Sequence, residues 1–139
     1  MRYIRIQEED TPELYTLHSA YKREILENAP TAENLSALRR AIQGERILFY
    51  GCREGDRLIA CCSISLMFST FDYEQGGLFE DFYILPAYRH RGIARQLISF
   101  ALQQSGCSTL LVCCADCDLE MYRALGFRTR IGNTLGFVK

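Results

Sequence analysis

The chain has 139 residues, of which 48% are hydrophobic and 24% are charged, and its formal net charge is −1. This length fits one domain with a single core, and the near-zero charge gives no global signal for nucleic acid or an anionic membrane. No apolar run reaches the length of a membrane span, and the polar, alternating N-terminus is unlike a secretion signal. We therefore expect one cytoplasmic domain over residues 1–139.

Apolar periodicity and turn residues predict the elements of the first half of the chain. Asp10-Thr11-Pro12 is typical of a helix start, because a capping side chain precedes a proline. Either Thr31 or Asn34 can cap a second helix. The predicted order is a strand at 3–6, a helix with an apolar stripe up to 25, a helix between 31 and 44, a strand at 47–53, a turn at 54–56 and a strand at 57–68.

The second half predicts a crossover followed by a hairpin. The expected elements are a polar loop at 69–77, a strand at 79–85, a helix at 94–104, a strand at 109–114, a short helix at 118–125 and two final strands at 127–131 and 134–138. An antiparallel meander followed by strand, helix and strand gives a mixed sheet with helices on both faces. The fold class is therefore α/β, with about seven strands.

The most informative segment runs from Glu80 to Phe100, where a strand stops at Pro86 and a basic turn leads into a helix. The first N–H groups of a helix have no internal partner, and the helix dipole favours negative charge there. Three cations beside this opening suit a ligand with more than one phosphate. The segment is neither a P-loop nor a Rossmann fingerprint. Taken alone, it also fits an ordinary basic helix N-terminus.

Two motifs in the second half resemble those of the GNAT superfamily of N-acetyltransferases. Arg89, Gly92 and Ala94 match its coenzyme A turn, Gln/Arg-x-x-Gly-x-Gly/Ala. Residues 122–127, Tyr-Arg-Ala-Leu-Gly-Phe, resemble its Tyr-x-x-x-Gly-Phe, one helix and one strand later. The resemblance implies the acyl-CoA N-acyltransferase fold, in which the fourth and fifth strands separate and the pantetheine arm enters the gap.

The resemblance implies acetyl-CoA as co-substrate, with no metal. Phe82, Tyr83 and Ile84 are expected to pair with pantetheine, and the Ile84 N–H to polarise the thioester carbonyl; the alternative is a plain core strand. The side chains of Arg89 and Arg95 either add positive charge beside the phosphates or are ordinary surface cations. For binding, we expect the backbone or position of these two residues to matter more than their side chains. The residues expected around the pyrophosphate are Arg89, His90, Arg91, Gly92, Ile93, Ala94 and Arg95.

Two residues are expected to move protons. Tyr122 protonates the leaving thiolate, since a phenol and an aliphatic thiol have similar pKa values; the alternative is a core tyrosine. Glu80 and Asp81 are adjacent in an apolar strand and are expected on opposite faces. Residues 79–84 resemble Leu-Glu-Asp-Phe-Phe-Val of the spermidine/spermine acetyltransferases, in which the Glu lies beside the acceptor amine. Glu80 is therefore the expected base, acting through water, or else a structural salt-bridge partner.

Other features depart from the family pattern or leave alternatives open. An Asn that contacts pantetheine in many family members is replaced here by Ala115. Of the seven cysteines, Cys114-x-x-Cys117 allows a redox or zinc role, but reduced, buried, structural thiols are expected.

Together the motifs predict transfer of an acetyl group from acetyl-CoA to a primary amine of a small molecule in a ternary complex. The alternatives are acetylation of a protein N-terminus or lysine, and a non-catalytic module that senses coenzyme A. The expected partner is the small-molecule amine, with no nucleic acid or membrane. A homodimer is left open, because dimers are common among similar proteins.

Overall fold

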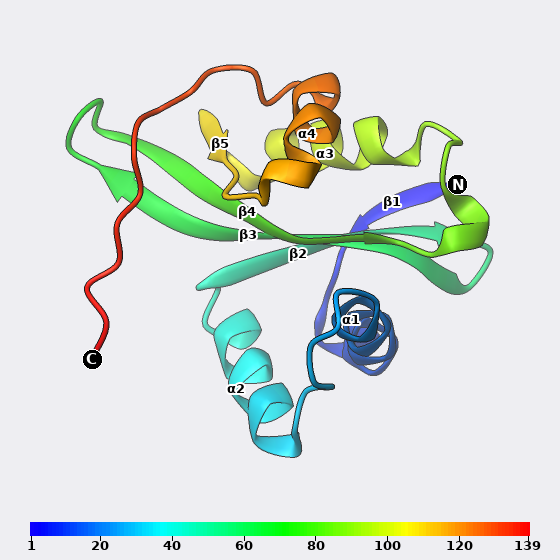
Figure 1. Ribbon diagram of the computed structural model, residues 1–139. Helices are drawn as coiled ribbons and strands as arrows, with labels where there is room; N and C mark the ends of the chain where they lie inside the picture. Colours follow the sequence, from blue (N-terminus) through cyan, green and yellow to red (C-terminus); the bar gives the residue numbers. More distant parts are fainter.

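A computed structural model describes residues 1–139 as a five-stranded mixed sheet with helices on both faces (Figure 1). The strands lie in the order β1-β2-β3-β4-β5; the first four are antiparallel, and β5 is parallel to β4. The elements are β1 (Arg2–Arg5), α1 (Thr11–Glu24), α2 (Ala32–Gln43), β2 (Ile47–Glu54), β3 (Arg57–Ser69), β4 (Glu74–Ile84), α3 (Ile93–Ser105), β5 (Thr109–Leu111) and α4 (Leu119–Leu125). None of these helices is long and apolar enough to cross a membrane.

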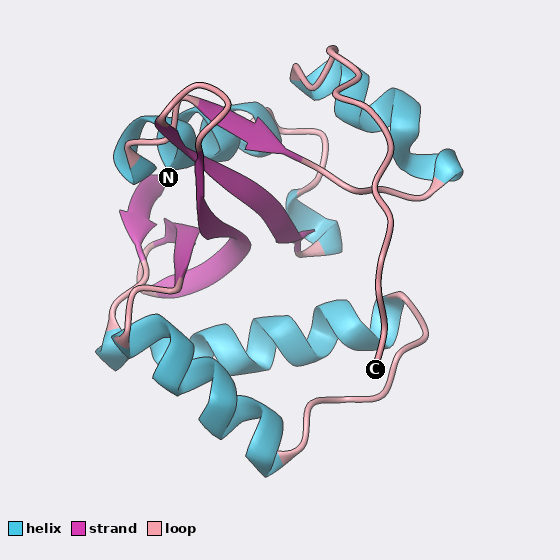
Figure 2. Ribbon diagram, turned by 90° about the vertical axis from the view of Figure 1, so that its left-hand side faces the viewer, coloured by secondary structure: helices cyan, strands magenta, loops and turns pink.

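The two faces of the sheet carry separate hydrophobic clusters. Helices α1 and α2 cover one face and α3 and α4 the other, as the side view in Figure 2 also shows. On the α1 face, Leu14 and Leu17 pack with Phe49. On the α3 face, Leu97 packs with Phe79. Because both faces are covered, β3 is buried over residues 58–64 and reads as a continuous apolar run rather than an alternating one.

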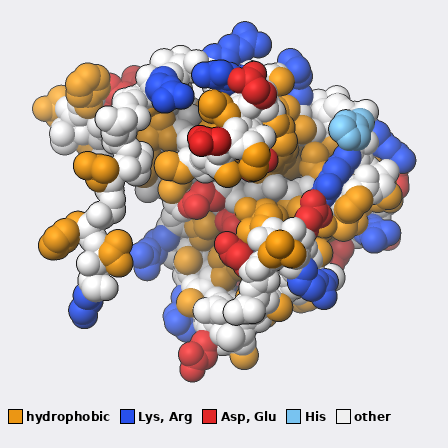
Figure 3. Space-filling view, in the orientation of Figure 1, with side chains coloured by type: hydrophobic (Ala, Val, Ile, Leu, Met, Phe, Trp, Pro, Cys, Tyr) orange, Lys and Arg blue, Asp and Glu red, His pale blue; other side chains and the backbone are white.

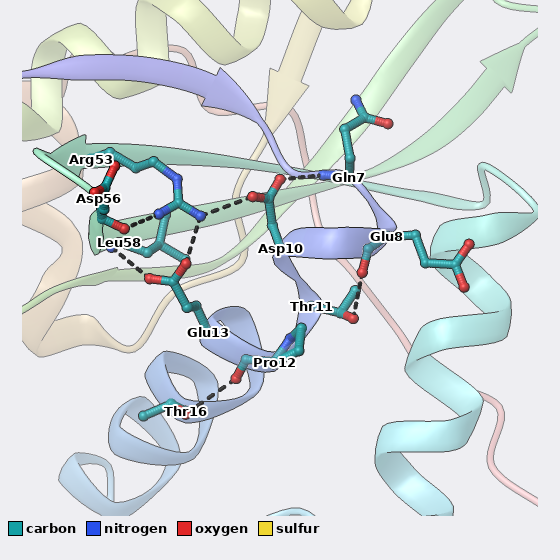
Figure 4. Close-up of polar contacts among 10 residues, drawn as sticks. All are labelled: Gln7, Glu8, Asp10, Thr11, Pro12, Glu13, Thr16, Arg53, Asp56 and Leu58. Carbon is teal, nitrogen blue, oxygen red and sulfur yellow. Dashed lines mark hydrogen bonds and ion pairs between the residues drawn. The ribbon is translucent and has the colours of Figure 1, made fainter.

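A buried arginine fixes helix α1 against the β2–β3 hairpin (Figure 4). The Arg53 guanidinium donates to Asp10 at 2.8 Å and to Glu13 at 2.7 Å, and the second Glu13 oxygen accepts from the Leu58 N–H at 3.0 Å. The hydrogen bond from Arg53 lowers the pKa of Glu13. Removing one partner of such a pair leaves a charge uncompensated. The first turn of α1 is therefore held in one position, and the rest of that helix with it.

The cap predicted for α2 is confirmed, whereas Asp10 precedes α1 without a side-chain capping bond. Thr31 is the N-cap of α2, and Asn34 completes a capping box by accepting from the Thr31 N–H. Helices α3 and α4 end at Gly106 and Gly126, which have φ values of +70° and +118°. Glycine adopts this left-handed conformation at little cost.

The predicted polar loop at 69–77 is wrong, because β4 begins at Glu74 and only the hairpin tip is left as a turn. Two glycines, Gly76 and Gly77, suggested a loop. They lie instead within the strand, where a Cβ atom on Gly77 would come within 2.3 Å of Ile64 Cγ2. Gly77 therefore lets the Ile64 side chain of the neighbouring strand β3 approach the backbone of β4 closely.

The sheet has five strands rather than about seven, since the predicted hairpin over 127–138 does not form. Strand β5 also ends at Leu111, three residues early. In Figures 1 and 2 the C-terminal segment runs away from the sheet. Leu135, Phe137 and Val138 are exposed there. An isolated two-stranded hairpin is marginal in water, and this segment has no core surface to cover its apolar residues.

The cysteines divide into two groups. Cys52, Cys61, Cys62 and Cys107 are buried, as expected, and burial raises the pKa values of the first three thiols. Buried thiols of this kind are poor nucleophiles. Cys113 and Cys117 are exposed, which corrects the expectation of burial for that part of the chain. All seven are free thiols.

Candidate active site

Strands β4 and β5 pair over a short distance and then separate. The paired residues are Gly76–Leu78 on β4 and Thr109–Leu111 on β5. Strand β4 continues to Ile84, so residues 79–84 keep one edge without a strand partner. This is the separation that the family resemblance implied. It leaves a free strand edge to which an extended ligand can add.

A bulge distorts β4 beside this open edge. Cys61 pairs with Tyr83 and Ser63 with Glu80, so one β3 residue, Cys62, faces two residues of β4. The first of these, Asp81, has a φ of +50°, a conformation that non-glycine residues rarely adopt. Bulges of this kind reorient the backbone and side chains that follow.

The Ile84 N–H points to the open edge of β4. The next residue, Leu85, donates its N–H to the Ile59 carbonyl on β3 at 3.0 Å. Successive amides of a strand point to opposite sides. The Ile84 N–H therefore points away from β3, toward the gap that β5 leaves, which is the direction that polarising a thioester carbonyl requires.

The basic turn presents a series of unpartnered amides. The backbone N–H groups of residues 90–95 donate to no acceptor in the protein, and the first helical bond of α3 is the one from Gln96 to Gly92 at 3.4 Å. Such groups at a helix N-terminus attract anions, since both the free donors and the helix dipole favour negative charge. The turn thus holds six consecutive donors at one place.

Gly92 leaves open space in front of these amides. Its φ is +78°, and a Cβ atom built there would meet no atom within 4 Å. The neighbouring His90 also has a positive φ, +61°, which is costly for a residue with a side chain. The backbone is therefore held in a rare conformation at the point where the amides are free.

The arginines of the turn have different tasks. Arg89 makes two bonds to the Glu24 carboxylate, at 2.7 and 2.8 Å, and donates to the Ile84 carbonyl at 2.9 Å. Arg95 donates to the Ala124 carbonyl of α4 at 3.1 Å. The Arg91 guanidinium lies over the Tyr88 ring and has no carboxylate partner. Arg89 and Arg95 thus tie the turn to α1 and α4, and Arg91 keeps its charge available.

Tyr122 lies on α4 against the aromatic residues of β4. Its ring centroid is 6.4 Å from that of Phe82 and 5.7 Å from that of Phe127. Burial, with smaller contributions from nearby Tyr21 and Asp118, raises the pKa of Tyr122 to about 12. The phenol therefore keeps its proton at neutral pH. Tyr122 lies beside Phe82, and Tyr21 of α1 lies beside Tyr83, so both tyrosines border the part of β4 that has no strand partner.

Glu80 and Asp81 lie on one face, not on opposite faces as expected. Cross-strand partners point the same way, so Glu80 shares the face of Ser63. Asp81 also accepts from the Ser63 hydroxyl at 2.6 Å. The bulge causes this, because it turns Asp81 toward α1. Glu80 is exposed and has no ion-pair partner, so the structural salt bridge considered for it does not form.

Sequence reasoning missed the α1 residues that face the bulge. The His18 Nδ1 atom lies 3.7 Å from Asp81 Oδ1, and the Tyr21 ring contacts those of His18 and Tyr83, with centroids 6.2 and 5.8 Å apart. His18 is four residues after Leu14, on the inward side of the helix. A polar residue at an inward helical position was the available signal. Two surface hollows beside α2, of about 440 and 590 Å³, include none of these residues.

Solved structures share this fold over nearly the whole chain. A probable acetyltransferase superposes with a TM-score of 0.85 at 18% identity, with 100% of both chains covered. A predicted acetyltransferase from Clostridium acetobutylicum, solved with acetyl-CoA, gives 0.77 at 14%, covering 97% of this chain and 95% of that one. An aminoglycoside acetyltransferase from an uncultured soil metagenomic sample, in complex with sisomicin, gives 0.83 at 12%, covering 99% and 95%. No curated protein matches the sequence.

A mixed sheet that opens beside a bulged strand, with free amides at the adjoining helix start, defines the molecule as an acyltransferase-like α/β protein. The family model for the acetyltransferase (GNAT) domain matches residues 45–129, which include the bulge, the turn and Tyr122. The chain belongs to this family, and it is an N-acetyltransferase.

Proposed function

We propose that the protein transfers the acetyl group of acetyl-CoA directly to a primary amine of a small molecule, with both substrates bound together. The observation that carries this proposal is the row of six unpartnered amides at residues 90–95, with open space before Gly92. A diphosphate fits such a row, because its oxygens accept several hydrogen bonds at once.

The turn and the open strand edge together fit the two ends of the coenzyme. The amides of residues 90–95 bind the diphosphate, and Arg91 adds positive charge beside it. Phe82, Tyr83 and Ile84 offer a free strand edge to pantetheine, and the Ile84 N–H is directed at the thioester oxygen. A fixed donor aimed at developing negative charge stabilises the tetrahedral transition state.

Tyr122 is the proposed acid that protonates the thiolate as it leaves. Burial keeps the phenol protonated, with a pKa of about 12. The same apolar surroundings raise the pKa of a thiol placed against Phe82 and Tyr122, so the leaving group remains basic enough to take the proton. The position of Tyr122 between α4 and the open edge supports this role.

Glu80 is the proposed acidic residue that receives the acceptor amine. Its carboxylate is exposed on the α1 face, next to the bulge, and attracts a cation without a competing arginine. In Figure 3, acidic side chains lie along the middle of this view, between the helix layers, and Lys and Arg gather around its edges. This charge distribution favours an amine that carries positive charge. Exposure suits Glu80 to binding the amine in its charged form.

A second copy of the chain is the proposed partner of the exposed apolar residues. Phe71 and Tyr73 at the β3–β4 tip and Leu135 and Phe137 in the C-terminal segment are exposed by 98%, 74%, 92% and 106%. Pairing of two copies covers this surface. Light scattering across a concentration series is expected to show a dimer, and removal of residues 131–139 a monomer. A monomeric full-length chain at all concentrations contradicts the proposal.

A thiol-release assay with an amine panel tests the function. The panel contains polyamines, aminoglycosides, amino sugars and peptides with a free N-terminus or lysine. Release of coenzyme A with at least one small amine, in preference to every peptide, is the expected result. If the enzyme prefers peptides, its acceptor is a protein rather than a small molecule. If calorimetry detects no binding of acetyl-CoA, the proposal that acetyl-CoA is the acetyl donor is wrong.

A further inference from the structure

A histidine and an aspartate meet behind the bulge of β4. Asp81 Oδ1 lies 3.7 Å from His18 Nδ1, and the other Asp81 oxygen accepts from the buried Ser63 hydroxyl at 2.6 Å. The side chains of His18 and Asp81 are only 12% and 19% exposed. Two polar side chains are thus held together inside the α1 face of the sheet, where polar groups without partners are costly.

The surroundings hold Asp81 in a strained backbone conformation. Asp81 has a φ of +50°, and the register shift between β3 and β4 falls at the same place. The Cys61 thiol contacts the Asp81 carbonyl at 3.5 Å, and Ser63 holds its carboxylate. Conformations of this kind persist only where the surroundings impose them, and they are frequent at functional sites. Without the bulge, the Asp81 side chain would point to the α3 face.

His18 is oriented as a base would be. Its Nδ1 is buried and has no hydrogen-bond partner, and Asp81 Oδ1 lies 3.7 Å from it. The Nε2 atom is not among the buried, unpartnered atoms. A proton on Nδ1, facing the carboxylate, leaves the lone pair on Nε2 toward the open side. A separation of 3.7 Å is too long for a hydrogen bond, and such contacts commonly shorten when substrate binds.

Burial keeps His18 neutral against the opposing charge of Asp81. Burial is the largest influence and lowers its pKa; Lys22 lowers it further, and Asp81 and Glu27 raise it. Lys22 and Glu27 pair with each other at 2.8 Å, and the Tyr21 ring lies tilted beside the imidazole, with centroids 6.2 Å apart. Glu80 lies on the same face of the sheet, opposite Ser63. A neutral imidazole at neutral pH is ready to accept a proton.

His18 also lies on the side of the gap where the acceptor must approach. Tyr21 connects His18 to strand β4, since its ring lies beside those of His18 and Tyr83. Tyr122 is the proposed donor of the opposite proton. The proton acceptor and the proton donor thus stand on α1 and α4, on the two sides of the open edge of β4.

We propose that His18, oriented by Asp81, accepts the proton of the acceptor amine. This rests on the proposed function. His18 Nε2 takes one proton from the ammonium group, and the free amine attacks the thioester carbonyl carbon to form a C–N bond. The C–S bond then breaks, and sulfur takes the Tyr122 proton. The second nitrogen proton returns to Tyr122 through water, and His18 releases its proton to solvent.

The test uses full-length His18→Gln, Asp81→Asn and Glu80→Gln with an amine that the wild-type enzyme acetylates. For His18→Gln we expect kcat to fall about 10²- to 10³-fold, as for loss of a general base, with acetyl-CoA affinity unchanged in calorimetry. The fall in kcat/KM of the wild type below the His18 pKa should disappear in this variant. Glu80→Gln should keep it. In Asp81→Asn that fall should move to lower pH, because Asp81 raises the pKa of His18.

Two measurements guard against a folding defect. Histidine ring NMR of the wild type should give His18 a pKa that matches the acidic limb of kcat/KM. Added imidazole should restore part of the activity of His18→Ala, which a purely structural histidine would not allow. Wild-type kcat and an intact acidic limb in His18→Gln overturn the inference and leave the proposed function standing. If no amine is acetylated by the wild-type protein, the proposed function itself has failed.

Discussion

The proposed donor side and the proposed acceptor side of the site are built from different parts of the polypeptide. At the start of α3 the groups proposed to bind the donor are backbone amides, and two of the three arginines there tie elements together. On the α1 face of the β4 bulge the groups proposed to act on the acceptor are side chains, which contact one another where Asp81 has a strained backbone conformation. We therefore expect the donor side to tolerate changes of side-chain chemistry but not added bulk, and the acceptor side to behave in the opposite way.

The largest expected effect is that of bulk at Gly92. Gly92→Glu places a carboxylate in the open space before the free amides, so acetyl-CoA binding should fall more than about 100-fold. The protein should stay folded, because no atom lies within 4 Å of the new Cβ and the strained φ costs only about 1–2 kcal/mol. Calorimetry and circular dichroism measure the two quantities.

Gly55→Glu is the matched control for that change. Gly55 also has a positive φ, +57°, and open space around it, but it lies in the β2–β3 turn. Its affinity for acetyl-CoA should equal that of the wild type. If the two variants bound acetyl-CoA with equal affinity, residues 90–95 would not form its binding site.

The next effect is that of the Tyr122 hydroxyl. Tyr122→Phe should lower kcat about 10- to 10³-fold with little change in acetyl-CoA affinity, on the scale of general-acid effects. Tyr15→Phe is a control, since Tyr15 lies on α1 and bonds to the Leu35 carbonyl. Because burial raises the pKa of Tyr122 to about 12, wild-type kcat should stay level through pH 10. If Tyr122→Phe keeps the wild-type kcat, another group must protonate the leaving thiolate.

Removal of charge at Glu80 should have a moderate effect. Glu80→Gln removes the exposed carboxylate beside the bulge, so KM for a cationic amine should rise about 5- to 10-fold, which corresponds to about 1 kcal/mol. The effect should shrink at high salt, since exposed charges are screened. Glu33→Gln, on the first turn of α2, removes the same charge elsewhere and should change nothing. An unchanged KM in Glu80→Gln would separate this residue from the acceptor.

The smallest effects should distinguish the arginines of the turn. Arg91→Gln should weaken acetyl-CoA binding about 3- to 10-fold and reduce its salt dependence, because Arg91 has no carboxylate partner. Arg89→Gln should instead lower the melting temperature, because it removes the bonds to Glu24 and to the Ile84 carbonyl. Affinity measurements across a salt series compare the two. The reverse pattern would mean that Arg89 is the phosphate ligand.

Much of the fold could be predicted because local rules decide it. The caps at Thr31 and Gly106 follow from helix-end chemistry, and the turn before α3 follows from its basic residues and Gly92. The misplaced start of β4 shows where local rules fail. Gly76 and Gly77 have the composition of a loop, and the close approach of Ile64 to Gly77, which only the folded structure reveals, explains why a glycine lies at that position of the strand.

The candidate site likewise has a part that the sequence predicts and a part that only the folded structure reveals. Its backbone part is encoded in a short contiguous segment, so residues 89–95 could be identified by pattern. The contact between His18 and Asp81 joins residues 63 positions apart and depends on a bulge that no periodicity reveals. The C-terminal strands were expected from alternation alone, which does not say whether a surface exists to cover Leu135 and Phe137.

The most direct test of the donor-site assignment is a titration of the ¹⁵N-labelled protein with coenzyme A, followed by amide NMR. We predict the largest shifts for the amides of residues 90–95, since hydrogen bonds to a diphosphate change the environment of precisely placed N–H groups most strongly. Large shifts confined to other segments, or no shifts at saturating coenzyme A, would contradict the account.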